Sequence, residues 1–584
     1  MRARLALVIR SSFACVIAAG AGATASARVH RVTPGERVLD GERMNVRPGD
    51  VIAVQAGAYR FIRFPNVRGS AERPVTIVNE GGLVDVRNDD RGYAVVIERS
   101  QHVHLTGTGS RAHEYGFRCH ITKKGMTAFH VNGKSCDVEV DHVEISGAGF
   151  AGFNVKDEPR PDGSTNRPNF VMRNINLHHN YVHDVKGEGF YVGHTFYTGY
   201  KVEGKVLYPH EIHGLRIHHN LTRRTGCEGI QVGSAAEDVE IHDNVIEDAG
   251  VAPFADYQNN GMQIGTATTG RIYNNVIRRC PGTGIIITGR GNNTFANNLV
   301  VDCGGSGMYL MDREQEMSGV GYRFVNNTIV NPGDWGFGLN CARAPEIVVA
   351  NNIVVQDNGK PHIQNHKAGT KLVKRNNLLV RSVAEVGFAN PAEGDYRLAR
   401  ASAARGRGGI EVAYGVTTDL AGRDRPKRSA WDLGAYSYAP PERAAVSSTD
   451  ADAGRAAAAS APRKMAKAGA VAAFDGLLRG CLVEVLAGGD AARVWLAGSK
   501  QKLVGIDDEG TLSLSASGLT LTIPWKRLSL KDRLGLALVC VRDEQPDRHA
   551  IAAFYALATG DDAAAQRHLA AAGAFAADVR GMFE

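Results

Sequence analysis

An asparagine followed nine residues later by a glycine recurs along the chain. Asn244 adds a copy with eight extra residues before Gly261, and an earlier copy has Val143 in the asparagine place. Asn352 and Asn377 continue the column, and successive asparagines from 180 lie 23 to 40 residues apart. This internal repeat restricts the fold strongly, because every copy must adopt the same local structure. The five complete pairs are Asn180/Gly189, Asn220/Gly229, Asn275/Gly284, Asn298/Gly307 and Asn327/Gly336.

Each copy has the pattern of three short strands separated by the asparagine and the glycine. Apolar residues alternate, as at Leu215 and Ile217 or at Ile230 and Val232, which is the period of a strand. A single copy cannot bury its apolar face, so the copies must stack. On coils about 4.8 Å apart, the asparagine amides can hydrogen-bond to one another along the axis. The repeat therefore predicts an all-β fold, a parallel β-solenoid over residues 28–438.

Two further stretches carry a resemblance to a known group of proteins. "VRPGDVIAVQAGAYRFIRFPNVRGSAERPVTIVNEGG" is similar to the amino-terminal cap and first coils of secreted polysaccharide lyases, including the chondroitinase B and alginate lyase family. "TTDLAGRDRPKRSAWDLGAYSY", residues 417–438, resembles the closing coil of many secreted bacterial members. From about residue 30 to 438 the chain thus resembles the pectate-lyase-like superfamily, which implies a right-handed parallel β-helix. That superfamily includes lyases, hydrolases, epimerases and non-enzymatic adhesins, so the resemblance alone selects no activity.

The chain departs from the lyase family at its catalytic arginine. Ile287, Thr288 and Gly289 stand where that arginine would fall, and Arg290 lies in the following turn. The arginine is therefore not carried over, and calcium-assisted elimination is not implied. No calcium motif is present in the sequence, so the cofactor stays undetermined.

The first 27 residues have the pattern of a secretory signal peptide. Arg2, Arg4 and Arg10 accompany an apolar stretch that ends in "ASA". Its removal takes three arginines and no acids, which lowers the formal charge from +7 to +4. A charge this small does not indicate a nucleic-acid partner. No other segment has the roughly 20 apolar residues of a membrane span, so we expect a secreted or periplasmic protein.

Two of the cysteines, Cys280 and Cys303, each follow a repeat asparagine by five residues and should lie on neighbouring coils. A disulfide between them is conceivable, but stacked parallel side chains rarely offer the required torsion. We expect buried free thiols.

The composition changes after the repeats. Residues 439–473 are rich in alanine, proline and serine and have the pattern of a linker. Residues 474–584 then predict a small accessory domain of five short strands followed by helices, with "CLVEVLAGG" as the first strand. Its last two helices form a predicted hairpin, and protein contact is the expected role of this domain.

Insertions indicate where a binding groove is built. Two long loops, residues 157–170 and 194–214, follow the same strand of successive coils, and residues 251–259 enter just before Gly261. Loops on one face of a rigid scaffold supply the walls of a groove that holds a polysaccharide. The outward-facing column beneath them and the loop side chains are the predicted substrate-binding residues. They are Asn154, Gln231, Gln263, Tyr197, Tyr200 and His210.

Two kinds of chemistry fit this groove. Glu188 and Glu228 precede the glycines of adjacent coils, roughly 5 Å apart, so one carboxyl pKa should rise and give the acid and base of a hydrolase. The alternative is that both are ordinary corner acids paired with nearby cations. In a lyase, Lys156 would neutralise a uronate while His194 or Tyr191 moves protons. The alternative there is a solvated lysine and a histidine that packs within its loop.

Stacked histidines form a further column. His178, His218 and His242 occupy equivalent places, which raises the question of a metal site. The column continues into Tyr273 and Asn274, as a ladder of interchangeable polar residues would. Metal ligands must converge and not only stack, so the sequence assigns no metal ligand.

The sequence favours a carbohydrate-active protein, a polysaccharide lyase or a glycoside hydrolase. The alternative is a non-catalytic glycan-binding or surface-structural β-helix. Tyr309, Asp312 and Arg313 form a second candidate site on later coils.

Overall fold

The computed structural model describes residues 27–584 except 289–290, 313–320, 411–413, 441–469 and short segments between 488 and 584. The chain divides into two compact units, Met1–Ala444 and Ala445–Glu584. The predicted signal peptide, apart from its last residue, and most of the predicted linker lie outside the described residues, as do Arg290 and Arg313.

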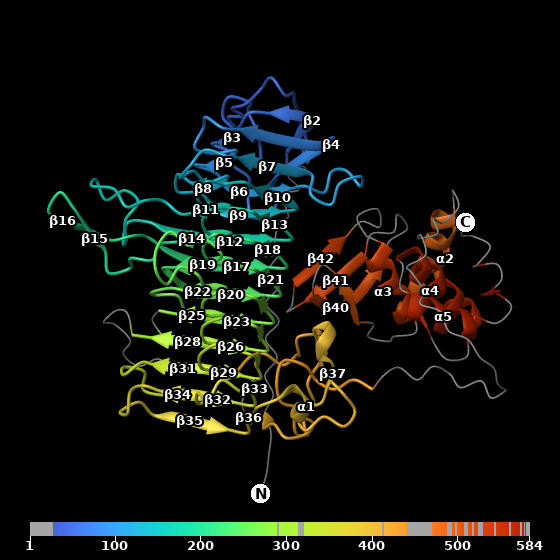
Figure 1. Cartoon of the computed structure of the whole chain (residues 1–584). Coiled ribbons are helices and arrows are strands. Elements are labelled where there is room, and N and C mark those ends of the chain that lie inside the picture. The colour runs from blue at the N-terminus through green and yellow to red at the C-terminus, as the bar shows by residue number, and fades with distance from the viewer. Residues whose placement is uncertain are drawn as a thin grey trace, which may run out of the picture. The chain divides into compact units, whose positions relative to one another are not determined.

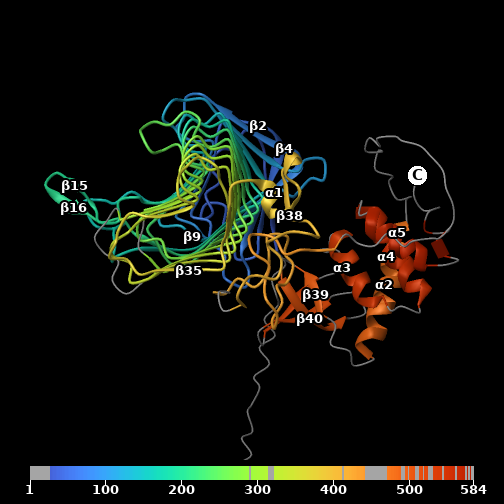
Figure 2. The same ribbon diagram turned by 60° about the horizontal axis from the view of Figure 1, so that its bottom comes forward.

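The first unit is a stack of coils with three short strands in each full coil (Figure 1). One strand per coil forms an 11-stranded parallel sheet. Figure 2 shows the coils nearly end-on. The strands of this sheet are β3 (Ile62–Pro65), β5 (Val95–Glu98), β8 (Phe129–Asn132), β11 (Phe153–Val155), β14 (Phe190–Gly193), β19 (Ile230–Gly233), β22 (Met262–Ile264), β25 (Ile285–Ile287), β28 (Met308–Met311), β31 (Phe337–Asn340) and β34 (Ile363–Asn365).

The other strands of the coils form a 23-stranded sheet that bends at each asparagine corner. They are β1 (Val29–Val32), β2 (Val51–Tyr59), β4 (Val75–Asn88), β6 (Gln101–Thr106), β7 (Phe117–Ile121), β9 (Cys136–Asp141), β10 (Val143–Ser146), β12 (Val171–His178), β13 (Tyr181–His183), β17 (Glu211–His218), β18 (Leu221–Arg223), β20 (Ala235–His242), β21 (Val245–Glu247), β23 (Gly270–Tyr273), β24 (Val276–Arg278), β26 (Asn293–Ala296), β27 (Leu299–Val301), β29 (Tyr322–Val325), β30 (Thr328–Val330), β32 (Ile347–Ala350), β33 (Ile353–Val355), β35 (Leu372–Arg375) and β36 (Leu378–Val380).

The asparagine ladder is present as predicted. Asn298 Nδ2 donates to Asn327 Oδ1 at 3.0 Å, and the backbone N–H of Asn298 donates to the same oxygen at 3.0 Å. The Nδ2 of Asn298 also donates to the carbonyl of Ile272. The same side-chain bond joins each asparagine from Asn180 to Asn377 to the next, over distances of 2.9 to 3.1 Å. Each buried corner therefore satisfies its own polar groups through its neighbours.

The core lies inside the coils. The residue after each corner glycine is buried as the repeat predicts, and Phe153 stacks on Phe190 with ring centroids 4.8 Å apart. Cys280 and Cys303 are buried free thiols, which confirms that prediction. The remaining inward residues of this column, Ile230, Met262, Ile285, Met308 and Phe337, are at most 1% exposed.

The predicted closing coil is wrong in its position. Residues 417–438 form no named strand and instead run along the asparagine corners of late coils. Asn297 Nδ2 donates to the Thr418 carbonyl at 2.6 Å, and Asn326 Nδ2 donates to the Asp432 carbonyl at 3.1 Å. The segment bonds to corner side chains because these present spare donors along the side of the stack. Between the last coil and this segment lie α1 (Val383–Val386), β37 (Phe388–Asn390), η1 (Pro391–Glu393) and β38 (Asp395–Leu398).

The second unit combines a four-stranded antiparallel sheet with helices and has its own apolar core. "CLVEVLAGG" is not a strand, because it ends a helix that starts inside the predicted linker. Leu478, Cys481 and Leu482 are buried, and this helical spacing emerges only when the preceding residues are read with the segment. The elements are α2 (Ala470–Ala487), β39 (Arg493–Leu496), β40 (Ser499–Ile506), β41 (Leu512–Ala516), β42 (Leu519–Ile523), α3 (Leu530–Cys540), α4 (Pro546–Thr559) and α5 (Asp562–Ala571).

Candidate active site

A groove of about 980 Å³ lies on the outer face of the 11-stranded sheet. Its floor follows one column of the sheet, in which Tyr191 pairs with Gln231, Gln231 with Gln263 and Gln263 with Ile286. This is the register that the repeat alignment predicts. The described lining residues are Phe150, Glu188, Tyr191, Thr195, Phe196, Gln231, Ala255, Asp256, Tyr257, Gln258, Asn259, Asn260, Gln263, Pro281, Gly282, Thr283, Ile286, Thr288, Gly304, Gly305, Ser306, Tyr309, Met311, Asp334 and Trp335.

Glu188 and Glu228 are both buried at this sheet, at 1% and 0% exposure. Burial raises the pKa of Glu188, and burial together with the neighbouring Glu188 charge raises the pKa of Glu228 to about 7. One oxygen of each carboxyl is buried without a hydrogen-bond partner among the described residues. Only Glu188 lines the groove; Glu228 lies behind it and accepts a bond from Asn260 Nδ2 at 2.9 Å. The structure thus supports one carboxyl in the groove and a second that influences its charge.

Lys156 and His194 form a buried polar group behind Tyr191. Lys156 Nζ lies 2.8 Å from Glu158 Oε1 and 4.1 Å from the centroid of the Tyr191 ring. His194 Nε2 lies 2.9 Å from Glu158 Oε2. Burial acts to lower the pKa of Lys156, but the phenol of Tyr191 and the carboxylate of Glu158 raise it by more. Tyr191 is the member of this group that lines the groove.

The loop residues predicted to bind substrate lie outside the lining. Tyr197 donates to Glu211 Oε1 at 2.6 Å, and Tyr200 stacks on His194 with centroids 5.7 Å apart. His210 is 1% exposed, and its Nε2 accepts the backbone N–H of Asp157 at 3.0 Å. His210 joins the two long loops, and Tyr197 and Tyr200 make their contacts within the second loop; the loop sequence alone cannot distinguish such roles from substrate contact.

Of the remaining predictions, Asn154 is half-buried in the same column but one coil before the groove. The long loop continues into a hairpin of β15 (Tyr200–Val202) and β16 (Lys205–Leu207), which projects from the β-helix in both views (Figures 1 and 2). Only Thr195 and Phe196 of this loop line the groove.

Sequence reasoning assigned Tyr309 to a separate site on later coils and missed Trp335, so it did not place the aromatic end in this groove. Tyr309 and Trp335 stack with centroids 6.2 Å apart. Gly338 lies beneath both rings: a Cβ there would be 2.4 Å from Tyr309 Cδ2 and 3.1 Å from Trp335 Cε3. Tyr257, on the third insertion, is 82% exposed at the opposite wall. In the sequence, this end of the groove is marked by Gly338, because the other residues of its outward-facing column have larger side chains.

The described lining contains no lysine or arginine but three acids, Glu188, Asp256 and Asp334. Two lysines lie close behind it, and both are paired with acids. Lys156 bonds to Glu158, and Lys360 pairs with Asp334 while its Nζ lies 5.4 Å from the Trp335 centroid. The groove is therefore acidic and aromatic where it is described.

Residues 210–381 match a family model described as "Right handed beta helix region". The first unit is a right-handed parallel β-helix. A search of curated proteins finds none that matches the sequence.

Solved structures of β-helix proteins resemble the chain at low sequence identity. A lacto-N-biosidase from Eubacterium ramulus is 11% identical, covering 61% of this chain and 68% of that one, with a TM-score of 0.40. The pectate lyase Pel9A is 13% identical, covering 70% and 96%, with a TM-score of 0.38. An alginate lyase from Paenibacillus is 14% identical, covering 61% and 99%, with a TM-score of 0.34. These likenesses extend to the fold alone.

No helix in the part of the chain that the structure describes is long and apolar enough to span a membrane.

Proposed function

We propose that this β-helix cleaves a glycan by hydrolysis in the groove, with Glu188 as the general acid. The observation that carries the proposal is a buried carboxyl in the groove lining with a raised pKa and an oxygen that has no partner among the described residues. A carboxyl with a raised pKa keeps its proton to higher pH than an ordinary carboxyl, and it can donate that proton to a leaving oxygen. A carboxyl with a purely structural role would have both oxygens paired.

Asp256 is the proposed base. It is exposed on the third insertion and lines the same groove as Glu188. In the proposed step, Glu188 protonates the glycosidic oxygen as the bond from the anomeric carbon to that oxygen breaks. Water attacks the anomeric carbon and gives its proton to Asp256. Glu228 lies outside the groove lining, and the charge of Glu188 contributes to its pKa of about 7.

The groove favours a neutral glycan over a polyanionic one. Its described lining supplies no lysine or arginine to pair with a polyanionic substrate, and the exposed carboxylate of Asp256 would repel one. Tyr257, Tyr309 and Trp335 supply aromatic faces, and Gln231 and Gln263 supply amides for hydroxyl groups. Sugar rings stack on such faces through their C–H groups while the amides bond the hydroxyls.

β-Elimination on a uronate is the second candidate, and the buried contact of Lys156 with Tyr191 favours it. Tyr191 or His194 would take the proton from C5, a C4–C5 double bond would form as the C4–O bond breaks, and the other of these two groups would give a proton to the departing oxygen. Lys156 would stabilise the negative charge that develops on the uronate. The position of Lys156 behind Tyr191, paired with Glu158, makes this candidate the weaker one.

The test is incubation of the protein with neutral and acidic polysaccharides, with reducing ends and ultraviolet absorbance of unsaturated product measured separately. We expect reducing ends without absorbance. Glu188→Gln should lower turnover about a hundredfold or more, and Asp256→Asn should do the same. Glu72→Gln, on an exposed residue outside the groove, is the matched control. Unsaturated product that requires Lys156 and His194 would select elimination, and binding without either product would select a glycan-binding protein.

We further propose that the protein is exported and that its second unit serves in protein contact. The arginines and apolar stretch of the first 27 residues support export. The separate core of residues 470–584 supports an independent role for that unit.

A further inference from the structure

The corner next to the asparagine ladder carries a second column, in which each residue has a left-handed backbone. His142, His179 and His219 have φ of 53° to 55°, and Asp243 has φ of 53°. The residue before each of them ends a long strand and stacks on its neighbours: the rings of His218 and His242 lie 4.9 Å apart at 5°. Six residues form a group that we call the histidine seam: His142, His178, His179, His218, His219 and His242.

The left-handed column is covered at one end and open at the other. Its later members Asn297, Asn326 and Asn351 are at most 1% exposed, and their Nδ2 atoms donate to the backbone carbonyls of Thr418, Asp432 and Gly409, respectively. His179 and His219, in the same column, are exposed. The seam is therefore the part of this corner that a dissolved ion can reach.

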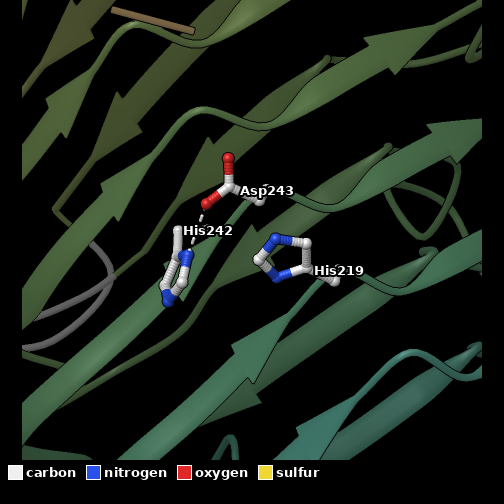
Figure 3. Close-up of side chains that lie close together, drawn as sticks. All are labelled: His219, His242 and Asp243. Carbon is white, nitrogen blue, oxygen red and sulfur yellow. Dashed lines mark hydrogen bonds and ion pairs between the residues drawn. The ribbon is translucent and has the colours of Figure 1, made fainter. Parts of the chain in front are cut away.

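Three side chains converge at the end of the seam. One ligand atom from each of His219, His242 and Asp243 lies within 4.8 Å of the others. Figure 3 shows His219 and His242 from neighbouring strands, with Asp243 beside both. His242 Nδ1 lies 2.7 Å from Asp243 Oδ2. Metal ligands must converge on one point, and the stacked sequence pattern alone did not show that these side chains do.

We propose that His219, His242 and Asp243 bind one divalent transition-metal ion of the zinc class. Two imidazoles and one carboxylate suit zinc and its neighbours, whereas calcium and magnesium take oxygen ligands. Bonds of about 2.1 Å in a tetrahedron place ligand atoms roughly 3.4 Å apart, so these atoms need to move by at most about 1.5 Å. Three protein ligands leave the fourth position to water.

The surroundings hold the ligands in place. The His242 ring lies between His218 and Tyr273, whose ring centroid is 4.7 Å away at 9°. Asp243 Oδ1 accepts a bond from Asn274 Nδ2 at 3.3 Å. His219 Nδ1 lies 2.8 Å from His218 Nδ1. Such outer contacts orient metal ligands and are part of a working site.

Neighbouring positions are less suitable. One coil earlier the equivalent residues are His179, His218 and His219, without a carboxylate, and one coil later they are Asn274 and Tyr273. A second cluster, His104 with Glu139 and Asp141, also fits within 4.8 Å. Its Asp141 is 3% exposed.

That second cluster is already satisfied by hydrogen bonds. Asp141 is bonded to His104 at 2.5 Å, His142 at 2.5 Å and Thr106 at 2.6 Å. Glu139 is bonded to His178 at 2.7 Å. An ion there would have to displace several short bonds, whereas the bonds of Asp243 to His242 and Asn274 are longer, at 2.7 and 3.3 Å.

The bound ion would join the coil of β17 to the coil of β20. It lies on the 23-stranded sheet, whereas the groove lies on the 11-stranded sheet, so we expect an effect on stability and not on glycan cleavage. A ligand that binds only the folded state raises its stability by mass action. This inference does not depend on the proposed hydrolysis.

The test is a titration of the untagged, chelator-treated protein with Zn²⁺, followed by calorimetry and by the thermal midpoint. Co²⁺ provides a second probe through its visible absorption bands. We expect one Zn²⁺ per chain, and binding weakened at least tenfold in His219→Asn and Asp243→Asn. Asparagine already occupies this column at Asn274, so both variants should fold.

His183→Ala is the matched control, since His183 pairs with Glu144 and Asp184 outside the seam. It should bind Zn²⁺ as the wild type does. The proposal is overturned if the wild type takes up no Zn²⁺, or if His219→Asn and Asp243→Asn bind as tightly as wild type. It is also overturned if His104→Ala loses the ion while Asp243→Asn keeps it.

Discussion

Lys156 Nζ lies 4.1 Å from the centroid of the Tyr191 ring, so a buried cation sits against a residue of the groove floor. The same lysine lowers the pKa of Glu188 through its charge, although burial raises that pKa by more. Lys156 therefore connects the two candidate chemistries, because it acts on Glu188 in hydrolysis and on the substrate in elimination.

The variant Lys156→Met should distinguish hydrolysis from elimination. If Glu188 is the general acid, activity falls as pH rises through its pKa, and removal of the nearby cation raises that pKa. We expect the alkaline limb of kcat/KM to move upward by roughly half a unit to one unit. Lys201→Met, in the projecting hairpin, should leave the profile unchanged. A hundredfold loss at every pH would instead indicate elimination.

Glu228 should make stability depend on pH. Its folded-state pKa of about 7 exceeds the ordinary value of 4.5, so the folded protein binds the extra proton between these values. The free energy of unfolding should therefore fall as pH rises from about 4.5 to about 7, by up to about 3 kcal/mol from this group. Glu228→Gln should lack that component in urea unfolding at several pH values. If the free energy of unfolding varied with pH in the same way in the wild type and in Glu228→Gln, the raised pKa would not belong to Glu228.

Gly338→Ala should damage the aromatic end of the groove. The new methyl would lie 2.4 Å from Tyr309 Cδ2, so the Tyr309 and Trp335 rings must move. We expect KM for a cleaved glycan, or Kd for a bound one, to rise about tenfold, with little change in thermal midpoint. Gly369→Ala, where a Cβ meets no atom within 4 Å, is the control. Unchanged KM would place the substrate elsewhere along the groove.

Asn298→Ala should destabilise the ladder without touching the groove. Asn298 Oδ1 accepts from the backbone N–H and the Nδ2 of Asn275; the buried N–H would lose this acceptor, and the Nδ2 would lose one of its bonds. The expected loss is about 3 kcal/mol in the free energy of unfolding. Asn169→Ala, on an exposed loop, should cost far less. Equal losses would mean that the ladder contributes little.

Limited proteolysis should cut within residues 439–473 and leave two resistant fragments. We expect this because the chain forms two compact units with separate apolar cores. Mass spectrometry of the fragments locates the cut. If the protease left a single resistant fragment, the domain boundary would not lie within residues 439–473.

The repeat determined the β-helix because it is a local, periodic signal. Each asparagine and each glycine meets its counterpart on the next coil, so spacing in the sequence becomes stacking in space. The same logic placed Tyr191, Gln231 and Gln263 in one column of the sheet. It failed at residues 481–489, where a nine-residue window was too short to distinguish a helix from a strand.

Tertiary structure alone decided which side chains meet. The insertions carry no period, so their sequence could not reveal that Tyr197 and His210 bond within the loops while Tyr257 lines the groove. Glu188 and Glu228 look equivalent in sequence, but Asn260, which follows the third insertion, bonds to Glu228, and only Glu188 lines the groove. Stacking of the histidines was predictable from register; the convergence of His219, His242 and Asp243 was not, because it depends on the left-handed turn at each corner.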